Sequence, residues 1–407
     1  MRRPSPSRRS KAALGLAAAT LTAVGLLPAA IAPAQAAPPA GTFSKGGEDD
    51  HLYPRNELSP QLRAKLDKAV RDAMKKAGIP GVQVGVWLPG KGSYVRAFGV
   101  ADKRTGEPMT DDMRVRIGSE TKTFTATAVL ELVDDGRVRL NDPISKYVKG
   151  VPNGNHIRLR DLLDMRSGLF SYTADNNFIH DFLSNPQRVF TPKELLAYGF
   201  KHPNVFAPGA KFQYSNSNYI LLGLVIEKVT GKSVREVIEH RVLRPSHLDQ
   251  TLFPKAGEFP RPHPHGYTNQ TLSGKVADST HWNPSWAWSA GAMISDLHDL
   301  KHWARDLATG TLLSPATQAE RLKVLPTGTP GAGYGLGIVN VNGWTGHNGS
   351  LPGYESLTVY LPEQKATLVA LLNTDILYKG QEPSTVLGTA ITQVITPKHI
   401  WGLEPQR

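Results

Sequence analysis

The strand-forming segments of this chain lie toward its two ends, and a long, mainly helical stretch separates them. Alternating apolar residues over 82–88 and 94–100 flank a turn rich in glycine and proline, which predicts a hairpin. Much later in the chain, residues 334–341, 354–361 and 366–372 have the strand-forming pattern again. We therefore expect an α+β fold, in which an antiparallel sheet flanked by helices is interrupted by a mainly helical insertion lobe.

Apolar residues at helical spacing place several helices around this sheet. They predict helices at 59–77, 191–200, 218–230, 233–242 and 383–395. No internal repeat is evident. We expect a single domain over 58–400, made of a sheet lobe (58–140 and 285–400) and a helical lobe (141–284).

The amino-terminal segment has the order of a secretory signal peptide. Residues 2–11 carry five basic side chains and no acid, residues 12–32 are largely apolar, and Ala34 and Ala36 form a cleavage site. We expect cleavage after Ala36, secretion of the protein, and an unstructured linker over 37–57. A membrane anchor is the alternative, but small and helix-breaking residues interrupt the apolar run, so we expect no stable anchor. The paired arginines leave the Sec and twin-arginine routes both open.

Composition limits the chemistry of the chain. The absence of cysteine excludes disulfides, a thiol nucleophile and a cysteine zinc site, which leaves hydroxyl, amine, imidazole and carboxylate groups. The net charge of +12 stays positive without the signal peptide. A basic exported protein is able to adhere to an anionic cell wall, although an ordinary soluble surface explains the same charge. No motif for nucleic acid is present, and we expect no such partner.

A serine and a lysine three residues apart open a helical segment. Ser119 and Lys122 form the only S-x-x-K motif of the chain, just before the helical run 124–133, and Gly118 allows a sharp turn into it. This spacing puts both side chains on one helix face, so the amine lies beside the hydroxyl. A serine hydroxyl needs such a base to act as a nucleophile. Taken alone, the pair also fits a helix cap and a solvated lysine.

Tyr214 and Asn216 form a second polar motif, Y-x-N, in a predicted loop between helices. Their side chains point the same way if the backbone is extended. A phenol next to the Lys122 ammonium loses its proton more readily and is then able to accept the proton of Ser119. A core tyrosine and a turn asparagine are the alternative.

The third motif lies between the predicted strands 334–341 and 354–361, and consists of His347, Asn348, Gly349 and Ser350. Gly349 permits a ligand or a backbone to approach closely, so an edge strand is able to bind substrate there. The alternative is a histidine in a glycine-rich surface loop.

Together, the order and wide spacing of the three motifs resemble the serine β-lactamase and penicillin-binding protein family: S-x-x-K, then Y-x-N, then a K/H-x-G triplet. The likeness is closest to the branch of class C β-lactamases, D-alanyl-D-alanine carboxypeptidases and related esterases, and covers roughly residues 61–395. Lesser motifs at 162–169, 219–223, 289–291 and 334–337 agree with it. The resemblance implies a β-lactamase/transpeptidase-like fold.

The resemblance also implies a secreted serine hydrolase that works through an acyl-enzyme, first of all a D-alanyl-D-alanine carboxypeptidase on cell-wall peptides. An esterase, a D-amino-acid amidase or a β-lactamase is the alternative, and a non-catalytic penicillin- or cell-wall-binding protein is an alternative of another class. By the resemblance, Ser119 attacks, Lys122 and Tyr214 share proton transfers, and His347 tunes the charge of Tyr214. The implied substrate-binding residues are Asn216, Asn348, Gly349 and Ser350, with the N–H groups of Ser119 and Ser350 as the oxyanion hole.

One departure bears on the substrate. Carboxypeptidases of this branch hold a terminal carboxylate with an arginine on the strand before the K/H-x-G triplet, but no arginine stands between Arg321 and Arg407. Asn348 and Ser350 supply only neutral hydrogen bonds, which hold a carboxylate less well than a guanidinium does. This weakens the carboxypeptidase hypothesis relative to an esterase or a D-amino-acid amidase.

The remaining expectations concern the rim of the site and its partners. We expect residues 170–190 and 255–288 to border the cleft, and Trp282, Trp286 and Trp288 to form its apolar wall or to pack in the core. His263 and His265 are taken as loop residues, and we expect no metal and no cofactor. We expect a monomer whose substrate is a small peptide, an ester or a β-lactam.

Overall fold

The two ends of the chain meet in one nine-stranded antiparallel sheet, as expected. The computed structural model describes residues 57–402, so the predicted signal peptide and all but the last residue of the predicted linker lie outside the described residues. The strand order is β3-β2-β1-β13-β12-β11-β10-β9-β8. The strands are β1 Gly81–Leu88, β2 Gly92–Asp102, β3 Glu107–Pro108, β8 Leu325–Pro326, β9 Ala332–Tyr334, β10 Val339–Val341, β11 Trp344–Leu351, β12 Tyr354–Leu361 and β13 Ala366–Leu372.

The centre of the sheet forms where the early hairpin meets the late strands. In β1, every residue is buried, and the strand pairs with β2 on one side and with β13 on the other. Strands covered on both faces are apolar in near-continuous runs. The predicted α+β fold is therefore confirmed.

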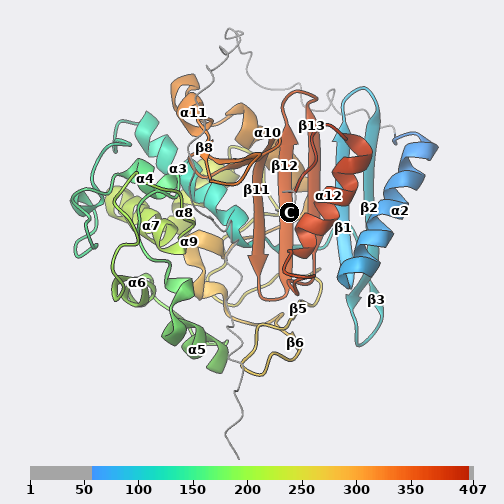
Figure 1. Cartoon of the computed structure of the whole chain (residues 1–407), viewed down its shortest axis with the longest axis horizontal. Helices are drawn as coiled ribbons and strands as arrows, with labels where there is room; N and C mark the ends of the chain where they lie inside the picture. The colour runs from blue at the N-terminus through green and yellow to red at the C-terminus, as the bar shows by residue number, and fades with distance from the viewer. Residues whose placement is uncertain (1–56, 403–407) are drawn as a thin grey trace, which may run out of the picture.

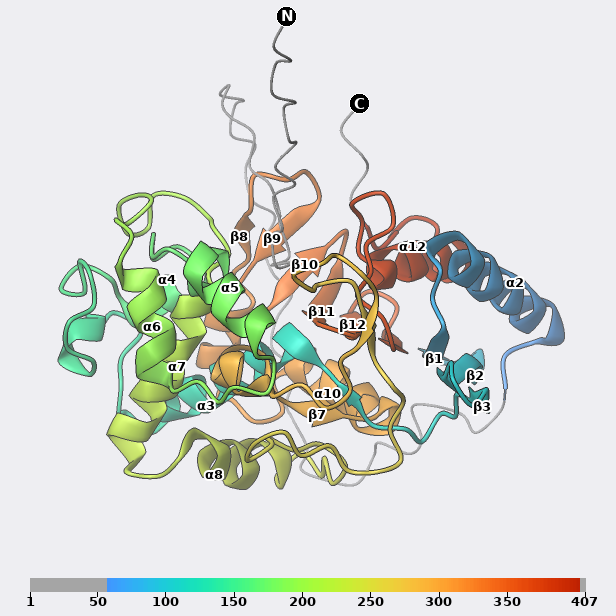
Figure 2. The ribbon, with the colours of Figure 1, turned by 90° about the horizontal axis from the view of Figure 1, so that it is seen from below.

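Helices cover both faces of the sheet. On one face, α2 (Pro60–Ala77) and α12 (Pro383–Ile395) pack side by side, and α10 (Leu297–Thr309) lies on the other (Figures 1 and 2). Helix α2 begins where the Ser59 hydroxyl accepts a hydrogen bond from the Leu62 N–H, and ends at Gly78, whose φ of 69° is left-handed. The remaining helix of this lobe is α11 (Pro315–Arg321).

A second lobe, mainly helical, lies beside the sheet (Figure 1). Between the lobes runs α3 (Thr121–Asp134), which is buried without interruption from Thr121 to Leu130 and contacts the helices of the second lobe. Its buried polar side chains are hydrogen-bonded, for example Thr123 to the carbonyl of Glu120 and Thr125 to the carbonyl of Ser289. The other helices here are α4 Leu159–Leu163, α5 Asn176–Ser184, α6 Pro192–Phe200, α7 Asn216–Thr230, α8 Val234–Ile238 and α9 Trp288–Gly291; the short pairs β4 Val115–Arg116 with β7 Ile294–Ser295, and β5 Tyr267–Thr268 with β6 Ala277–Asp278, complete the fold.

One expectation about the late strands was wrong. The predicted strand 334–341 is a hairpin, β9 and β10, whose turn contains Gly337 at a φ of 78°; a Cβ there would lie 2.3 Å from Cβ of Ala126 in α3. Residues 347–350 lie inside β11, which agrees with the expected edge strand and not with the alternative of a surface loop. Gly337 permits both the turn and the close packing against α3, and Gly349 permits the close packing of β11.

None of the helices in residues 57–402 combines the length and hydropathy needed to cross a membrane.

Candidate active site

Ser119 lies at the junction of the two lobes. It is part of the 3₁₀ turn η1 (Gly118–Glu120), which leads directly into α3. Gly118 has a φ of 51°, and a Cβ on it would lie 2.6 Å from the backbone nitrogen of Ser350; a Cβ on Gly349 would lie 1.9 Å from the carbonyl oxygen of Ile117. The turn and β11 therefore pack backbone against backbone, which only glycine at both positions permits.

Lys122 is placed to act as the base for Ser119. Its Nζ is hydrogen-bonded to Oγ of Ser119 at 3.0 Å and donates to the carbonyl of Ala290 at 2.7 Å. The side chain is fully buried, and burial lowers the pKa of Lys122 well below its ordinary value. A neutral amine in this position can accept the serine proton while one of its N–H groups stays on Ala290.

Tyr214 completes the group around Lys122. Nζ of Lys122 lies 4.9 Å from the centre of the Tyr214 ring. The phenol oxygen is buried without a hydrogen-bond partner of normal geometry, although the Ser119 hydroxyl is close enough to lower its pKa in part. Burial dominates and raises the pKa of Tyr214 above its ordinary value. The sequence-based expectation of a phenolate beside an ammonium thus changes to a neutral phenol beside a neutral amine, because burial penalises both charges.

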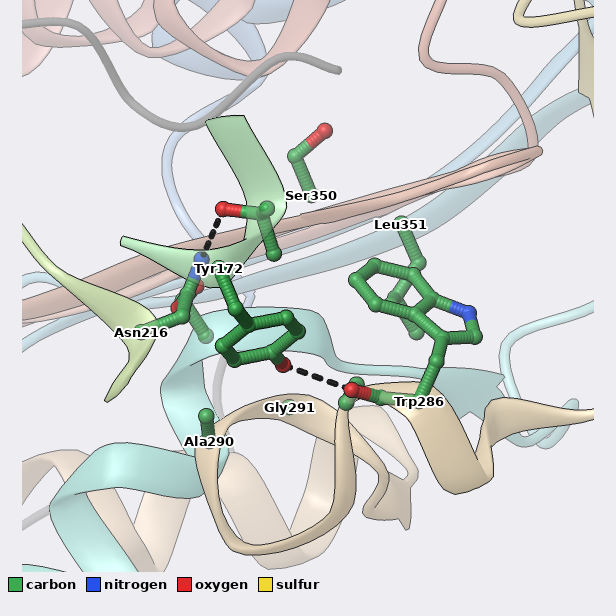
Figure 3. Close-up of a pocket in the computed structure, with 10 residues that line it drawn as sticks. Tyr172, Asn216, Trp286, Ala290, Gly291, Ser350 and Leu351 are labelled. Atoms are coloured by element: carbon green, nitrogen blue, oxygen red, sulfur yellow. Dashed lines mark hydrogen bonds between the residues drawn. The ribbon is translucent and has the colours of Figure 1, made fainter. Parts of the chain in front are cut away.

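Asn216 is the first residue of α7 rather than a loop residue, and its position is fixed by two hydroxyl groups. Its backbone N–H donates to Ser171 at 3.0 Å, and its side-chain Nδ2 donates to Thr173 at 3.1 Å. Figure 3 shows Asn216 at the wall of the pocket, opposite Trp286. The side chain is therefore held at the pocket edge before any substrate enters.

His347 is a neutral, fully engaged imidazole. Its Nδ1 lies against the carbonyl of Asn348, so Nδ1 carries the hydrogen, and Nε2 accepts a hydrogen bond from the Tyr334 hydroxyl at 3.1 Å. Burial is the main reason that the pKa of His347 is lowered to about 3. The ring centres of His347 and Tyr214 are 6.3 Å apart. His347 therefore influences Tyr214 as a neutral neighbour and not as a cation.

The predicted substrate-binding residues Asn348, Gly349 and Ser350 follow His347 along β11. Strand β10 pairs only with Trp344–Gly346, so in the described chain the second half of β11 pairs with β12 alone and its other edge faces η1. Ser350 lies at this edge and lines the pocket with Ser119. Asn348 differs from the expectation: its Nδ2 donates to Glu382 at 2.7 Å, so its amide nitrogen is engaged away from the pocket.

The pocket at Ser119 is small and uncharged. It has a volume of about 30 Å³, and all ten residues that line it are neutral: Ser119, Tyr172, Thr173, Asn216, Trp286, Ala287, Ala290, Gly291, Ser350 and Leu351. The Tyr172 hydroxyl donates to the carbonyl of Trp286 at 2.6 Å and so joins the segments 170–190 and 255–288 at the rim (Figure 3). These rim segments were predicted from the sequence, whereas Tyr172 and Thr173 belong to no motif and were not.

The three tryptophans have different surroundings, and only Trp286 lines the pocket of Ser119. Trp286 lines the pocket, whereas Trp282 packs edge-on against Phe182 and Trp288 lines a separate cavity. His263 stacks on Phe259 and His265 pairs with Asp278 at 2.7 Å. Residues 57–402 contain no cluster of three side chains suited to a metal.

Glu120, next to Ser119, gives a prediction for stability. Its carboxyl group is buried beside the hydroxyls of Ser356 and Thr358, and burial raises its pKa to about 8. Between pH 4.5 and 8 the folded protein keeps a proton that the unfolded chain releases, so stability falls as the pH rises. The free energy of unfolding of Glu120→Gln, relative to that of the wild type, should therefore rise by at least about 2 kcal/mol from pH 5 to pH 8. Urea unfolding at the two pH values measures this difference. The same difference at both pH values would show that Glu120 is ionised in the folded state.

The group of Ser119, Lys122 and Tyr214 between a nine-stranded sheet and a helical lobe defines a serine hydrolase of the β-lactamase/transpeptidase fold. The chain matches the family described as Beta-lactamase over residues 66–383. It belongs to the beta-lactamase family, and the resemblance stated from the sequence is confirmed.

Three relatives illustrate this membership. The chain is 28% identical over 334 residues to Protein flp of Staphylococcus aureus (strain N315). The matched region covers 79% of this chain but only 65% of that protein. A D-stereospecific amidohydrolase from Streptomyces sp. is 33% identical, with a TM-score of 0.73 and coverage of 82% of this chain and 99% of that one. The D-amino acid amidase from Ochrobactrum anthropi SV3, solved with L-phenylalanine amide, is 28% identical, with a TM-score of 0.73 and coverage of 82% and 98%.

Proposed function

We propose that the protein hydrolyses amides of D-amino acids through an acyl-enzyme on Ser119. The observation that carries the proposal is the contact between the Lys122 amine and the Ser119 hydroxyl in a pocket without charged side chains. The similarity to a D-stereospecific amidohydrolase and a D-amino acid amidase, each covered almost completely, supports the choice of substrate.

Acylation begins with the Ser119 proton. Lys122 Nζ accepts it while Oγ attacks the carbonyl carbon of the amide. The negative charge on the carbonyl oxygen is stabilised by the backbone N–H groups of Ser119 and Ser350, which the packing of Gly118 against β11 brings together. The Tyr214 phenol donates its proton to the leaving amine and regains one from Lys122. Deacylation repeats these steps with water as the nucleophile.

The choice between an amidase and a carboxypeptidase depends on the absence of an arginine on β10, where carboxypeptidases of this branch hold the terminal carboxylate of the substrate. On β10, the strand before His347, the residues are Val339, Asn340 and Val341, and the side chain of Asn340 donates to Thr345. A D-alanyl-D-alanine peptide would bring a terminal carboxylate to a pocket that offers it only neutral donors. A D-amino acid amide ends in a neutral group and has no such requirement. The amidase therefore replaces the carboxypeptidase as the leading hypothesis.

A substrate comparison tests this proposal. We expect D-alanine amide to be hydrolysed faster than L-alanine amide, and faster than an acetylated D-alanyl-D-alanine dipeptide, as measured by release of ammonia or D-alanine. Ser119→Ala serves as the control and should abolish all three activities. Faster cleavage of the dipeptide than of D-alanine amide would favour a carboxypeptidase. Hydrolysis by the Ser119→Ala protein would show that Ser119 is not the nucleophile.

A further inference from the structure

Arg116 is a buried guanidinium with free donors, three residues before the nucleophile. It lies on β4 and is 3% exposed. Its Nη2 donates to the carbonyl of Gly257 at 3.3 Å, but Nε and Nη1 have no hydrogen-bond partner. No carboxylate of the described chain forms an ion pair with it. Because a buried charge without an anion is costly, such a group is expected to have a partner in the working protein.

The Arg116 guanidinium is fixed in place and charged. It stacks over Phe259 with 4.5 Å between Cζ and the ring centre, and Phe259 in turn packs edge-on against Tyr354 at 5.5 Å. Burial lowers the pKa of Arg116 to about 10, which leaves it protonated at neutral pH. A rigid cation of this kind loses little entropy when it binds an anion.

The side chain of Arg116 lines a second pocket that adjoins the pocket of Ser119. Trp286 and Leu351 line both pockets. Figure 3 shows these two side chains together at one end of the active-site pocket, away from Asn216. The second pocket has a volume of about 10 Å³. This is space for about one water-sized group, so the pocket accepts an oxygen atom at the end of a chain and no ring.

We propose that Arg116 forms a carboxylate subsite, which binds an acidic side chain on the acyl part of the substrate. The chain of that residue passes Trp286 and Leu351 while its carbonyl carbon stays at Ser119. This proposal rests on the proposed function and narrows it: amides of D-glutamate are better substrates than amides of D-glutamine. The two side chains have nearly the same size, so only the charged oxygen distinguishes them. A carboxylate forms stronger hydrogen bonds with a guanidinium than a neutral amide does.

The test compares the 4-nitroanilides of D-glutamate and D-glutamine, each linked through its α-carboxyl group. We expect kcat/KM of the wild type to favour D-glutamate by about 10- to 100-fold, since hydrogen bonds to charged groups are worth about 1.5–3 kcal/mol. In Arg116→Met this ratio should fall to about 1 while hydrolysis of the D-glutamine substrate is retained. The matched control is Arg114→Gln, because Arg114 is bonded to Gln250 and the Arg261 carbonyl, outside this pocket. It should keep the wild-type ratio.

Further measurements separate this proposal from the proposed function. Hydrolysis of D-alanine 4-nitroanilide measures the amidase activity alone, because this substrate has no side-chain carboxylate that Arg116 could bind. Calorimetry on the Ser119→Ala protein, with Arg116 intact, compares the binding of D-glutamate α-amide and D-glutamine α-amide and remains informative if Arg116→Met fails to fold. Tighter binding of D-glutamate α-amide supports the subsite even when no amide is hydrolysed. Equal binding of the two ligands, or a wild-type kcat/KM ratio near 1, overturns it.

Discussion

Replacing Lys122 with methionine is expected to lower the rate of Ser119 acylation by about 10³- to 10⁴-fold, the upper range for the loss of a general base. Lys122 is the only amine hydrogen-bonded to Ser119 in residues 57–402, and its burial favours the neutral form that can accept a proton. Methionine has a similar length and carries no charge, so the fold should persist. The burst of leaving group in stopped-flow experiments with an activated D-alanine ester measures the effect.

The control for Lys122→Met is the same change at Lys146. That residue is exposed and pairs with Asp142, and the variant should acylate at the wild-type rate. Thermal unfolding of both variants verifies that they are folded. Acylation of the folded Lys122→Met protein at the wild-type rate would mean that another group takes the serine proton.

Tyr214→Phe is expected to reduce kcat/KM for amides by about 10²- to 10³-fold with the fold intact. The phenol oxygen is buried and lies near Ser119 without a hydrogen bond of normal geometry, so its deletion should cost little stability. An amide needs its leaving nitrogen protonated, whereas a nitrophenyl ester does not. The loss should therefore be larger for D-alanine amide than for a D-alanine nitrophenyl ester.

Tyr219→Phe is the matched control for this change. Tyr219 is also buried, and its ring centre lies 5.7 Å from Nζ of Lys122, but its hydroxyl donates to the carbonyl of Leu163. The variant should lose stability through the unpaired carbonyl and keep its activity. Equal rates for Tyr214→Phe and the wild type would exclude the phenol from proton transfer.

The fold was predictable because its strands and helices have strong local patterns. The predicted helices 59–77 and 383–395 agree with α2 and α12 to within a residue, and the early hairpin agrees with β1 and β2. The break at Gly337 was not predictable, because it follows from packing against Ala126, far away in the sequence. The same long-range packing of Gly349 against Ile117 places His347 and Ser350 in a strand.

The candidate site was predictable as a set of residues but not as a charge state. Two motifs named Ser119, Lys122 and Tyr214, and the structure brings these side chains together. Their protonation depends on burial, which the sequence alone does not define, so the expected phenolate becomes a phenol. Arg116 was missed because it belongs to no motif and is recognised only by its burial without a partner.

The most direct measurement of the central claim is mass spectrometry of the protein quenched in acid during turnover of D-alanine methyl ester. The account predicts an alanyl adduct on the peptide that contains Ser119, and no adduct on the Ser119→Ala protein. Hydrolysis without an adduct, or an adduct on a different residue that persists in Ser119→Ala, would contradict it.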